Sequence, residues 1–301
     1  MKKIEFEDQK LSKLSFGTVQ IGLDYGISNT KGKPTQTTAN EIISYLIEDG
    51  INCFDTAVAY GNSEEVLGHA LNAQDNVNII SKVKSELFTT DLEETVTSSL
   101  KRLQTNKLFG LLLHDSELLS DWNAQKTATV SLLQEKGLID YFGVSIYTSE
   151  EFDVAIKNPI IRIIQIPFNL FDQRAINDEW FRKAKEANKL IFIRSIFLQG
   201  LFFMNADQLT GNLVEAVPYL KEMHAIRTKL DLSIAEFTMA YVDSVATDAV
   251  ILFGCDTLDQ AKENISSYFN LPVINKEVLN KINSKFTNIP EYITNPGHWS
   301  L

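Results

Sequence analysis

Four polar residues of this sequence have types and spacing that could support acid–base chemistry. Asp55 follows a short apolar run, and Tyr60 comes five residues later in INCFDTAVAYGNSEEVLG, residues 51–68. Lys82 and His114 follow two further apolar runs. A lysine near a tyrosine favours the phenolate and an aspartate keeps that lysine charged, so the phenol could donate or accept a proton near neutral pH. The imidazole could donate a hydrogen bond to a carbonyl oxygen and fix its orientation.

Each of these residues also has a simpler interpretation. Tyr60 could be a loop tyrosine packed on the following helix, Lys82 a solvated strand-end lysine, and His114 a satisfied core histidine. Lys82 could instead form a Schiff base, as in barrel aldolases, but that reaction does not require Asp55 and Tyr60 in this order. The set of four favours acid–base catalysis. Because this set lacks an electron source, and the sequence shows no metal cluster or nucleophilic serine motif, a bound hydride donor is its natural complement.

The elements that must position these residues are short apolar runs, most of them separated by helical periods. An N-terminal alternation around Ile4, Phe6 and Leu11 predicts a short hairpin that leads into a first strand ending at Gly17 and Thr18. Most of the later runs end at polar residues, and the last at glycine: Asp55, Lys82, His114, Ser145, Gln165, Arg194 and Gly254. Eight such runs favour an α/β fold of the (β/α)8 TIM-barrel type over a doubly wound sheet, with the hairpin closing the bottom. The carboxyl ends of barrel strands meet at one mouth, so we expect these side chains to converge there.

Length and composition bound the class of protein. A chain of 301 residues, 44% hydrophobic and 22% charged, could form one large domain or two small ones. The barrel pattern predicts a single domain over residues 1–301. A formal charge of −11 argues against a nucleic-acid partner. The sequence shows no signal-peptide core and no apolar run near the roughly 18 residues of a membrane span, so we expect no membrane partner and a cytoplasmic protein. Cys53 and Cys255 lack metal-ligand spacing and are expected to be reduced thiols, without a metal site.

Three connecting segments carry more specific expectations. Asn62 or Ser63 should cap the helix after Tyr60, with Glu64 and Glu65 complementing its dipole. The Gly- and Thr-containing loop from residue 25 to 38 is expected at the surface. The tail from residue 288 to 301 either packs along the barrel or covers the substrate, and packing is favoured.

Several of these motifs together resemble the aldo-keto reductase superfamily. They are FDTAVAYGNSEEVLG, SK at 81–82, LLLHD at 111–115, GVS at 143–145 and IIQIPFN at 163–169. The resemblance extends from the first strand to about Asn264. It implies that Tyr60 is the general acid/base, that Lys82 and Asp55 tune it, and that His114 orients the carbonyl. The implied reaction is metal-free, reversible hydride transfer between a nicotinamide C4 of NADP(H) or NAD(H) and a small carbonyl or alcohol.

The resemblance also implies which residues bind the cofactor. Ser145 and Gln165 would hold the nicotinamide carboxamide, and Gly254, Gln260 and Asn264 would lie along the adenosine half. The full implied set is Gly17, Thr18, Ser145, Gln165, Arg194, Ser195, Gly254, Asp256, Gln260 and Asn264.

Three positions depart from the family pattern. Ile146 replaces the asparagine that usually follows the serine at 145. Arg194 stands where an aromatic residue usually stacks on the nicotinamide, and it could replace that ring or bind an anionic group of the substrate. Asp256 stands where a basic residue often grips the 2′-phosphate of NADP. A carboxylate there would repel a phosphate and could accept from a ribose hydroxyl, so we expect NAD(H) to be tolerated or preferred.

Two functions from different classes fit these observations. The first is an NAD(P)-dependent oxidoreductase that acts on an aldehyde, ketone or sugar-like substrate. The second is a reductase-like barrel that binds a nucleotide and regulates a partner protein with little turnover. The four-residue set favours the enzyme, whereas the changes at Ile146 and Arg194 are compatible with the regulator.

Overall fold

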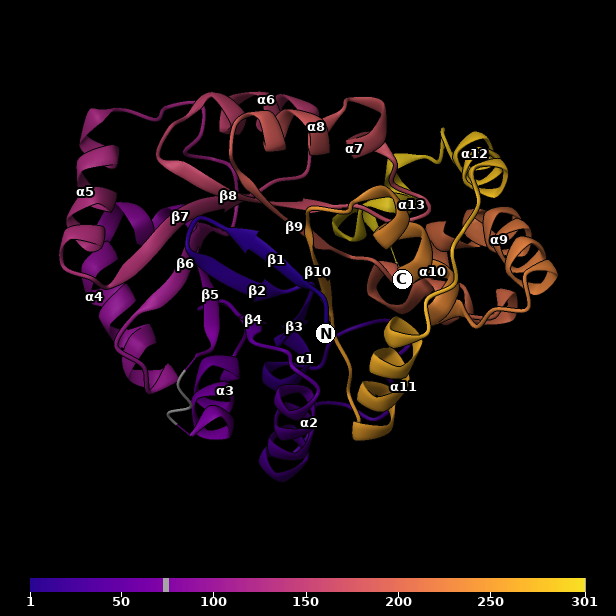
Figure 1. Ribbon diagram of the computed structural model, residues 1–301, viewed down its shortest axis with the longest axis horizontal. Helices are drawn as coiled ribbons and strands as arrows, with labels where there is room; N and C mark the ends of the chain where they lie inside the picture. The colour runs from indigo at the N-terminus through magenta and orange to yellow at the C-terminus, as the bar shows by residue number, and fades with distance from the viewer. Residues whose placement is uncertain (73–75, 301) are drawn as a thin grey trace.

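The centre of the protein is a closed barrel of parallel strands (Figure 1). The computed structural model describes residues 1–72 and 76–300. Around the barrel the strands follow the order β10, β3, β4, β5, β6, β7, β8, β9. They are β3 (Leu14–Gly17), β4 (Cys53–Asp55), β5 (Asn78–Val83), β6 (Leu108–Leu113), β7 (Ile139–Ser145), β8 (Ile161–Pro167), β9 (Leu190–Arg194) and β10 (Val250–Phe253). The predicted (β/α)8 barrel is confirmed.

The N-terminal hairpin is also confirmed. Strands β1 (Lys3–Phe6) and β2 (Gln9–Ser12) pair antiparallel, with Phe6 opposite Gln9. The hairpin lies across the end of the barrel inside the ring of helices (Figure 1). Buried Phe6 and Leu11 pack there against inward-facing strand residues such as Cys53 and Ile80, forming a core inside the barrel. The hairpin thereby closes the bottom of the barrel and keeps its apolar interior from water.

Helices surround the strands and bury the outer faces of the sheet. They are α1 (Val19–Gly22), α2 (Gln36–Glu48), α3 (Ser63–Leu71), α4 (Ser85–Leu103), α5 (Ala124–Glu135), α6 (Ser149–Lys157), α7 (Arg174–Asn177), α8 (Trp180–Glu186), α9 (Val217–Lys229), α10 (Ile234–Val245), α11 (Leu258–Phe269), α12 (Lys276–Lys285) and α13 (Glu291–Thr294). Short 3-10 turns occupy Leu198–Phe203, Ala206–Gln208, Gly211–Ala216 and Pro296–His298. Because both faces of the sheet are covered, the strands are almost continuously apolar.

The start of α3 differs from the sequence expectation. Asn62 occupies the N-cap position, but neither Asn62 nor Ser63 makes a capping hydrogen bond within the described residues. The Ser63 hydroxyl bonds instead with Thr18 and Thr56. Glu64, expected only to complement the helix dipole, is 2% exposed and is paired with Arg102. Tertiary contacts therefore replace local capping at this helix.

The loop before α2 and the C-terminal tail are also better defined than the sequence predicted. The helix begins at Gln36 behind a Thr35 cap, three residues earlier than expected, and Tyr25 of the loop is half-buried rather than fully at the surface. The tail packs on the 3-10 turn at Gly211–Ala216, where Asn212 donates to the His298 carbonyl at 2.8 Å. Pro296 of the tail also lines the barrel mouth.

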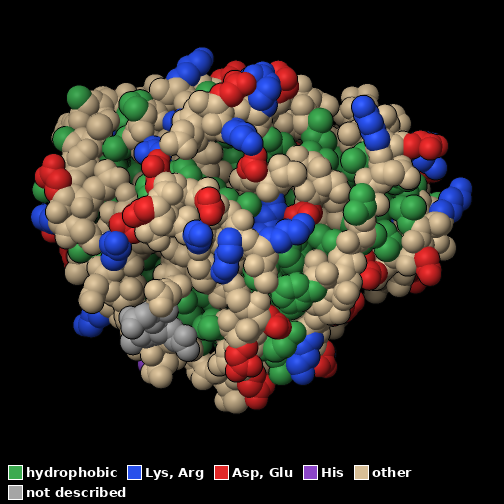
Figure 2. Space-filling view, viewed as in Figure 1, with side chains coloured by type: hydrophobic (Ala, Val, Ile, Leu, Met, Phe, Trp, Pro, Cys, Tyr) green, Lys and Arg blue, Asp and Glu red, His purple; other side chains and the backbone are tan. Residues whose placement is uncertain are grey.

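Charged side chains of both signs lie at the surface of the described residues. Acidic and basic side chains are intermixed on the face seen in Figure 2. Within residues 1–72 and 76–300, no helix has both the length and the apolar character needed to cross a bilayer.

Candidate active site

The carboxyl ends of the strands surround one cavity of about 650 Å³. Its volume is in the range of small-molecule and cofactor sites. All but one of the predicted site residues line it: Gly17, Thr18, Asp55, Tyr60, His114, Ser145, Gln165, Arg194, Ser195, Gly254, Asp256, Gln260 and Asn264. Lys82, the remaining one, is 1% exposed and lies beneath the cavity floor against Asp55 and Tyr60. The structure therefore brings the whole predicted set to one mouth.

Lys82 connects the acid and the phenol. Its Nζ donates to Asp55 Oδ1 at 2.5 Å, to the Thr56 carbonyl at 2.9 Å and to the Tyr60 hydroxyl oxygen at 3.4 Å. Burial alone would lower the pKa of Lys82, but the charge of Asp55 and the contact with Tyr60 outweigh it and raise the pKa above its usual value. The ammonium is therefore charged at neutral pH and lies within hydrogen-bond reach of the Tyr60 hydroxyl.

Gln165 completes the partners of Asp55. Its Nε2 donates to Asp55 Oδ2 at 2.8 Å, so each carboxylate oxygen has its own donor. This arrangement fixes the carboxylate plane and, through it, the direction of the Lys82 ammonium. It also connects β8 to β4 across the mouth.

His114 lies beside Tyr60 at the end of β6. The two rings are 5.4 Å apart at 82°, and the backbone amide of His114 is held by the Val83 carbonyl. Burial, together with the charges of Lys82 and Arg194, lowers the pKa of His114 to about 4. At neutral pH the imidazole is therefore uncharged and can donate one N–H to an oxygen bound near Tyr60.

The loop that carries Tyr60 is held by close backbone packing. A side chain at Gly22 would place its Cβ 2.0 Å from the Tyr60 carbonyl oxygen, so only glycine permits this approach. Ser63 bonds Thr18 Oγ1 at 2.6 Å and Thr56 Oγ1 at 3.1 Å. The loop after β4 is thus fixed to the end of β3, which places the phenol over Lys82.

Arg194 is one of the three positions that depart from the family pattern. Its guanidinium donates to the Ile146 carbonyl at 3.1 Å, and its Cζ lies 4.0 Å from the centre of the Tyr147 ring. Within the described part of the chain Arg194 has no carboxylate within ion-pair distance. The cavity wall near His114 therefore contains a positive charge that lies against an aromatic ring and has no ion-pair partner among the described residues.

Comparison with known proteins places the chain in a family. The sequence model described as "Aldo/keto reductase family" matches residues 13–286. The chain belongs to the aldo/keto reductase family. As a member of this family, it is an NAD(P)H-dependent oxidoreductase.

Individual relatives of this aldo/keto reductase are distant but extend over most of the chain. An uncharacterized oxidoreductase of Bacillus subtilis, YqkF, is 25% identical over 289 residues, 88% of this chain and 90% of its own. D-arabinose 1-dehydrogenase of Saccharomyces cerevisiae is 25% identical over 296 residues, 87% and 84% of the two chains. An aldo/keto reductase of Klebsiella pneumoniae, solved in complex with NADP and acetate, superposes with a TM-score of 0.72 at 18% identity, covering 95% of each chain. The last likeness shows the fold.

The cavity of this aldo/keto reductase fits a dinucleotide cofactor on two observations. At Gly254 an added Cβ would lie 2.3 Å from the Gln20 amide, so the glycine makes room for a polar side chain in the wall. In the described structure the buried Gln20 Oε1 and His114 Nδ1 have no hydrogen-bond partner. Buried polar atoms are nearly always paired, so unpaired ones in a cavity wall indicate where a ligand could bind.

Sequence reasoning missed several residues of this wall, among them two tyrosines and a glutamine. Tyr25, Tyr147 and Gln20 line the cavity, yet none follows an apolar run directly. The available signals were weak: Tyr147 comes two residues after Ser145, and Gln20 comes three residues after Gly17. Loop residues of this kind are placed by tertiary contacts rather than by periodicity.

Proposed function

We propose that this aldo/keto reductase interconverts an aldehyde, ketone or sugar-like carbonyl with the corresponding alcohol, with Tyr60 as general acid/base. The observation that carries the proposal is the contact of one buried ammonium, Lys82, with both Asp55 and Tyr60 beside a neutral His114. When bound, a nicotinamide cofactor supplies or accepts the hydride. The protein's own residues then manage the proton and the orientation of the substrate.

Each residue has a role that follows from its contacts. Tyr60 gives its hydroxyl proton to the carbonyl oxygen during reduction and takes it back during oxidation. Lys82 stabilises the resulting phenolate, and Asp55 holds Lys82 in place. His114 donates a hydrogen bond to the same substrate oxygen. Ser145 and Gln165 would hold the nicotinamide end of the cofactor, and Gly254 and Asn264 its adenosine end.

The relatives support the substrate class only in general terms. D-arabinose 1-dehydrogenase is named for a sugar substrate, and in this chain three tyrosines line the cavity, Tyr25, Tyr60 and Tyr147. Hydroxyl groups and flat rings suit a hydroxylated substrate.

Tyr60→Phe tests the proposal. General acid–base catalysis contributes roughly 10²–10⁴-fold, so we expect kcat for carbonyl reduction to fall by that factor while cofactor affinity in a fluorescence titration stays within about twofold. Tyr141→Phe is the matched control, because Tyr141 packs on Phe6 and Phe109 at the bottom of the barrel. Unchanged turnover in Tyr60→Phe would refute the role of Tyr60. Tight cofactor binding by the wild type without turnover of any carbonyl would favour the regulatory function instead.

A further inference from the structure

We infer that the end of the cavity away from His114 is built for the free hydroxyls of an adenosine ribose, so the preferred cofactor is NAD(H) rather than NADP(H). The inference rests on the proposed function, because it assumes that a nicotinamide cofactor binds in this cavity. It concerns Asp256, Gln20 and Asn29, and of these only Asp256 could be singled out from the sequence.

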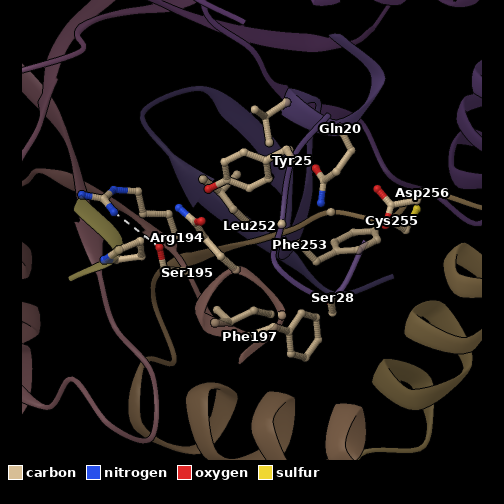
Figure 3. Close-up of a pocket in the computed structure, with 18 of the residues that line it drawn as sticks. Gln20, Tyr25, Ser28, Arg194, Ser195, Phe197, Leu252, Phe253, Cys255 and Asp256 are labelled. Atoms are coloured by element: carbon tan, nitrogen blue, oxygen red, sulfur yellow. Dashed lines mark hydrogen bonds between the residues drawn. The ribbon is translucent and has the colours of Figure 1, made fainter. Parts of the chain in front are cut away.

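The distribution of charge along the cavity is the first reason. Among the wall residues within 1–72 and 76–300, Arg194 is the only lysine or arginine. Figure 3 shows Arg194 on one side of the cavity and Gln20 and Asp256 on the opposite side. Asp256 comes just before α11 and Glu263 belongs to α11, and both line the cavity. A phosphomonoester carries nearly two negative charges at pH 7, so a 2′-phosphate placed there would meet carboxylates.

Asp256 is held in place by neutral partners. Asn29 Nδ2 donates to its Oδ1 at 3.3 Å, and its backbone amide donates to Gln260 Oε1 at 2.7 Å. The carboxylate is half-buried and has no lysine or arginine within ion-pair distance in the described structure. A fixed carboxylate without a cation is a strong acceptor for a hydroxyl and is the group that reads a free ribose 2′-hydroxyl in other NAD sites.

Gln20 supplies a second acceptor on the same side. Its Oε1 is buried and lacks a donor among the described residues, and the absence of a side chain at Gly254 lets its amide lie against the backbone there. A ribose hydroxyl can donate to this oxygen, whereas an ionised phosphate has no proton to give. Asp256 and Gln20 therefore both offer an acceptor oxygen on the side of the cavity opposite Arg194.

Two amides near the start of α11 are already paired. The N-terminus of a helix can bind phosphate through its free amides. Here the amide of Asp256 donates to Gln260 Oε1 and the amide of Gln260 donates to Thr257 Oγ1 at 3.2 Å, so both are already used. These two amides are therefore not free to bind a phosphate.

Isothermal titration calorimetry of the wild-type protein with NAD and with NADP provides the test. We expect NAD to bind at least about tenfold more tightly than NADP. The Asp256 carboxylate would accept a hydrogen bond from the ribose hydroxyl of NAD, whereas it would repel the 2′-phosphate of NADP. Asp256→Asn should tighten NADP binding by about tenfold and weaken NAD binding. Gln20→Leu should weaken NAD binding by roughly two- to tenfold, because its acceptor is lost.

Asp259→Asn is the matched control for Asp256→Asn. It removes the same charge from the same helix start, but Asp259 is exposed and outside the cavity, so both affinities should stay within about twofold. Equal or tighter binding of NADP by the wild type would overturn the inference and leave the proposed function standing. Binding of neither cofactor would overturn both. The wild-type comparison decides the question even if a variant fails to fold.

Discussion

At the scale of single residues, the neutral state of His114 makes a prediction about pH. Burial and the charges of Lys82 and Arg194 lower the pKa of His114 to about 4, so the imidazole keeps one charge state from pH 5 to pH 8. We expect kcat/KM for carbonyl reduction to show no step near pH 6.5, where an ordinary histidine titrates. A pH–rate profile of the wild type and of His114→Asn checks this. An inflection near 6.5 that disappears in the variant would show that a charged imidazole takes part.

Asp256 leads to a second pH prediction. Burial raises the pKa of its carboxyl to about 6, so the group is protonated below that pH and charged above it. The hydrogen-bond partners of Asp256, Asn29 and Gln260, carry no charge, and burial raises the pKa of the neighbouring Cys255 thiol, which therefore stays neutral. Glu263 lines the same cavity. The preference for NAD over NADP should therefore increase as pH rises from 5 to 8, and the increase should be smaller in Asp256→Asn. Affinities of both cofactors at four pH values measure it, and a preference that narrows with rising pH would contradict the prediction.

The sequence predicted residues that end strands and missed those that depend on loops. Asp55, Lys82, His114 and Gln165 could be found because each interrupts an apolar run, and in a barrel such positions converge. The environment of Arg194 could not be found in this way, since its partners Ile146 and Tyr147 belong to the loop after β7, and β8 separates β7 from β9 in the barrel. Their contact depends on how β7 and β9 are spaced around the barrel, which no local pattern encodes.

At the scale of elements, a buried network connects α3 and α4 to β5. Glu64 accepts from Arg102 Nε at 2.8 Å and from Ser81 Oγ at 2.6 Å, and Arg102 also donates to Ser99 at 3.1 Å. Ser81 directly precedes Lys82 on β5, while Glu64 follows the loop that carries Tyr60. The bond between Ser81 and Glu64 therefore helps to set the distance between Lys82 and the phenol.

A pair of serine substitutions separates positioning from stability. Ser81→Ala and Ser99→Ala each remove one buried hydroxyl from this network and should each lower the free energy of unfolding by about 1 kcal/mol. Only Ser81→Ala should also lower kcat, by about tenfold, and move the basic limb of the pH–rate profile, because small misplacements of acid and base groups are costly. Urea unfolding and pH-dependent kinetics measure the two effects. Equal kinetic losses in both variants would show that the network acts only through stability.

The capping of elements was the least predictable feature at this scale. Thr35, Thr148 and Ser233 cap their helices through side-chain oxygens as their residue types suggest. Ser63 has the same chemistry, yet its hydroxyl binds Thr18 and Thr56 instead. The Ser63 hydroxyl is buried between two strand ends and forms hydrogen bonds there. These tertiary contacts therefore replace the capping hydrogen bond that a serine usually makes at a helix start.

At the scale of the whole molecule, we propose that residues 1–301 fold as one domain. The two ends of its barrel have different roles. The bottom core contains the hairpin and inward-facing apolar residues, whereas the polar residues of the proposed site line the mouth. In a barrel of this type changes at the bottom affect stability and changes at the mouth affect activity. Because the hairpin does not contribute to the site, it could be predicted from the alternation of apolar and polar residues near the N-terminus alone.

Leu11→Ala tests this separation. Leu11 is fully buried at the bottom of the barrel, so its truncation should lower the free energy of unfolding by roughly 2–5 kcal/mol, with kcat/KM of the folded variant within about twofold of the wild type. Val273→Ala, at a site that is 96% exposed, should change stability by less than about 0.5 kcal/mol. Urea titrations followed by fluorescence measure the stabilities, and initial rates at low denaturant measure the activity. A large loss of kcat/KM in folded Leu11→Ala would contradict this separation. It would mean that a cavity at the bottom of the barrel changes the positions of Lys82 and Tyr60 through the strands.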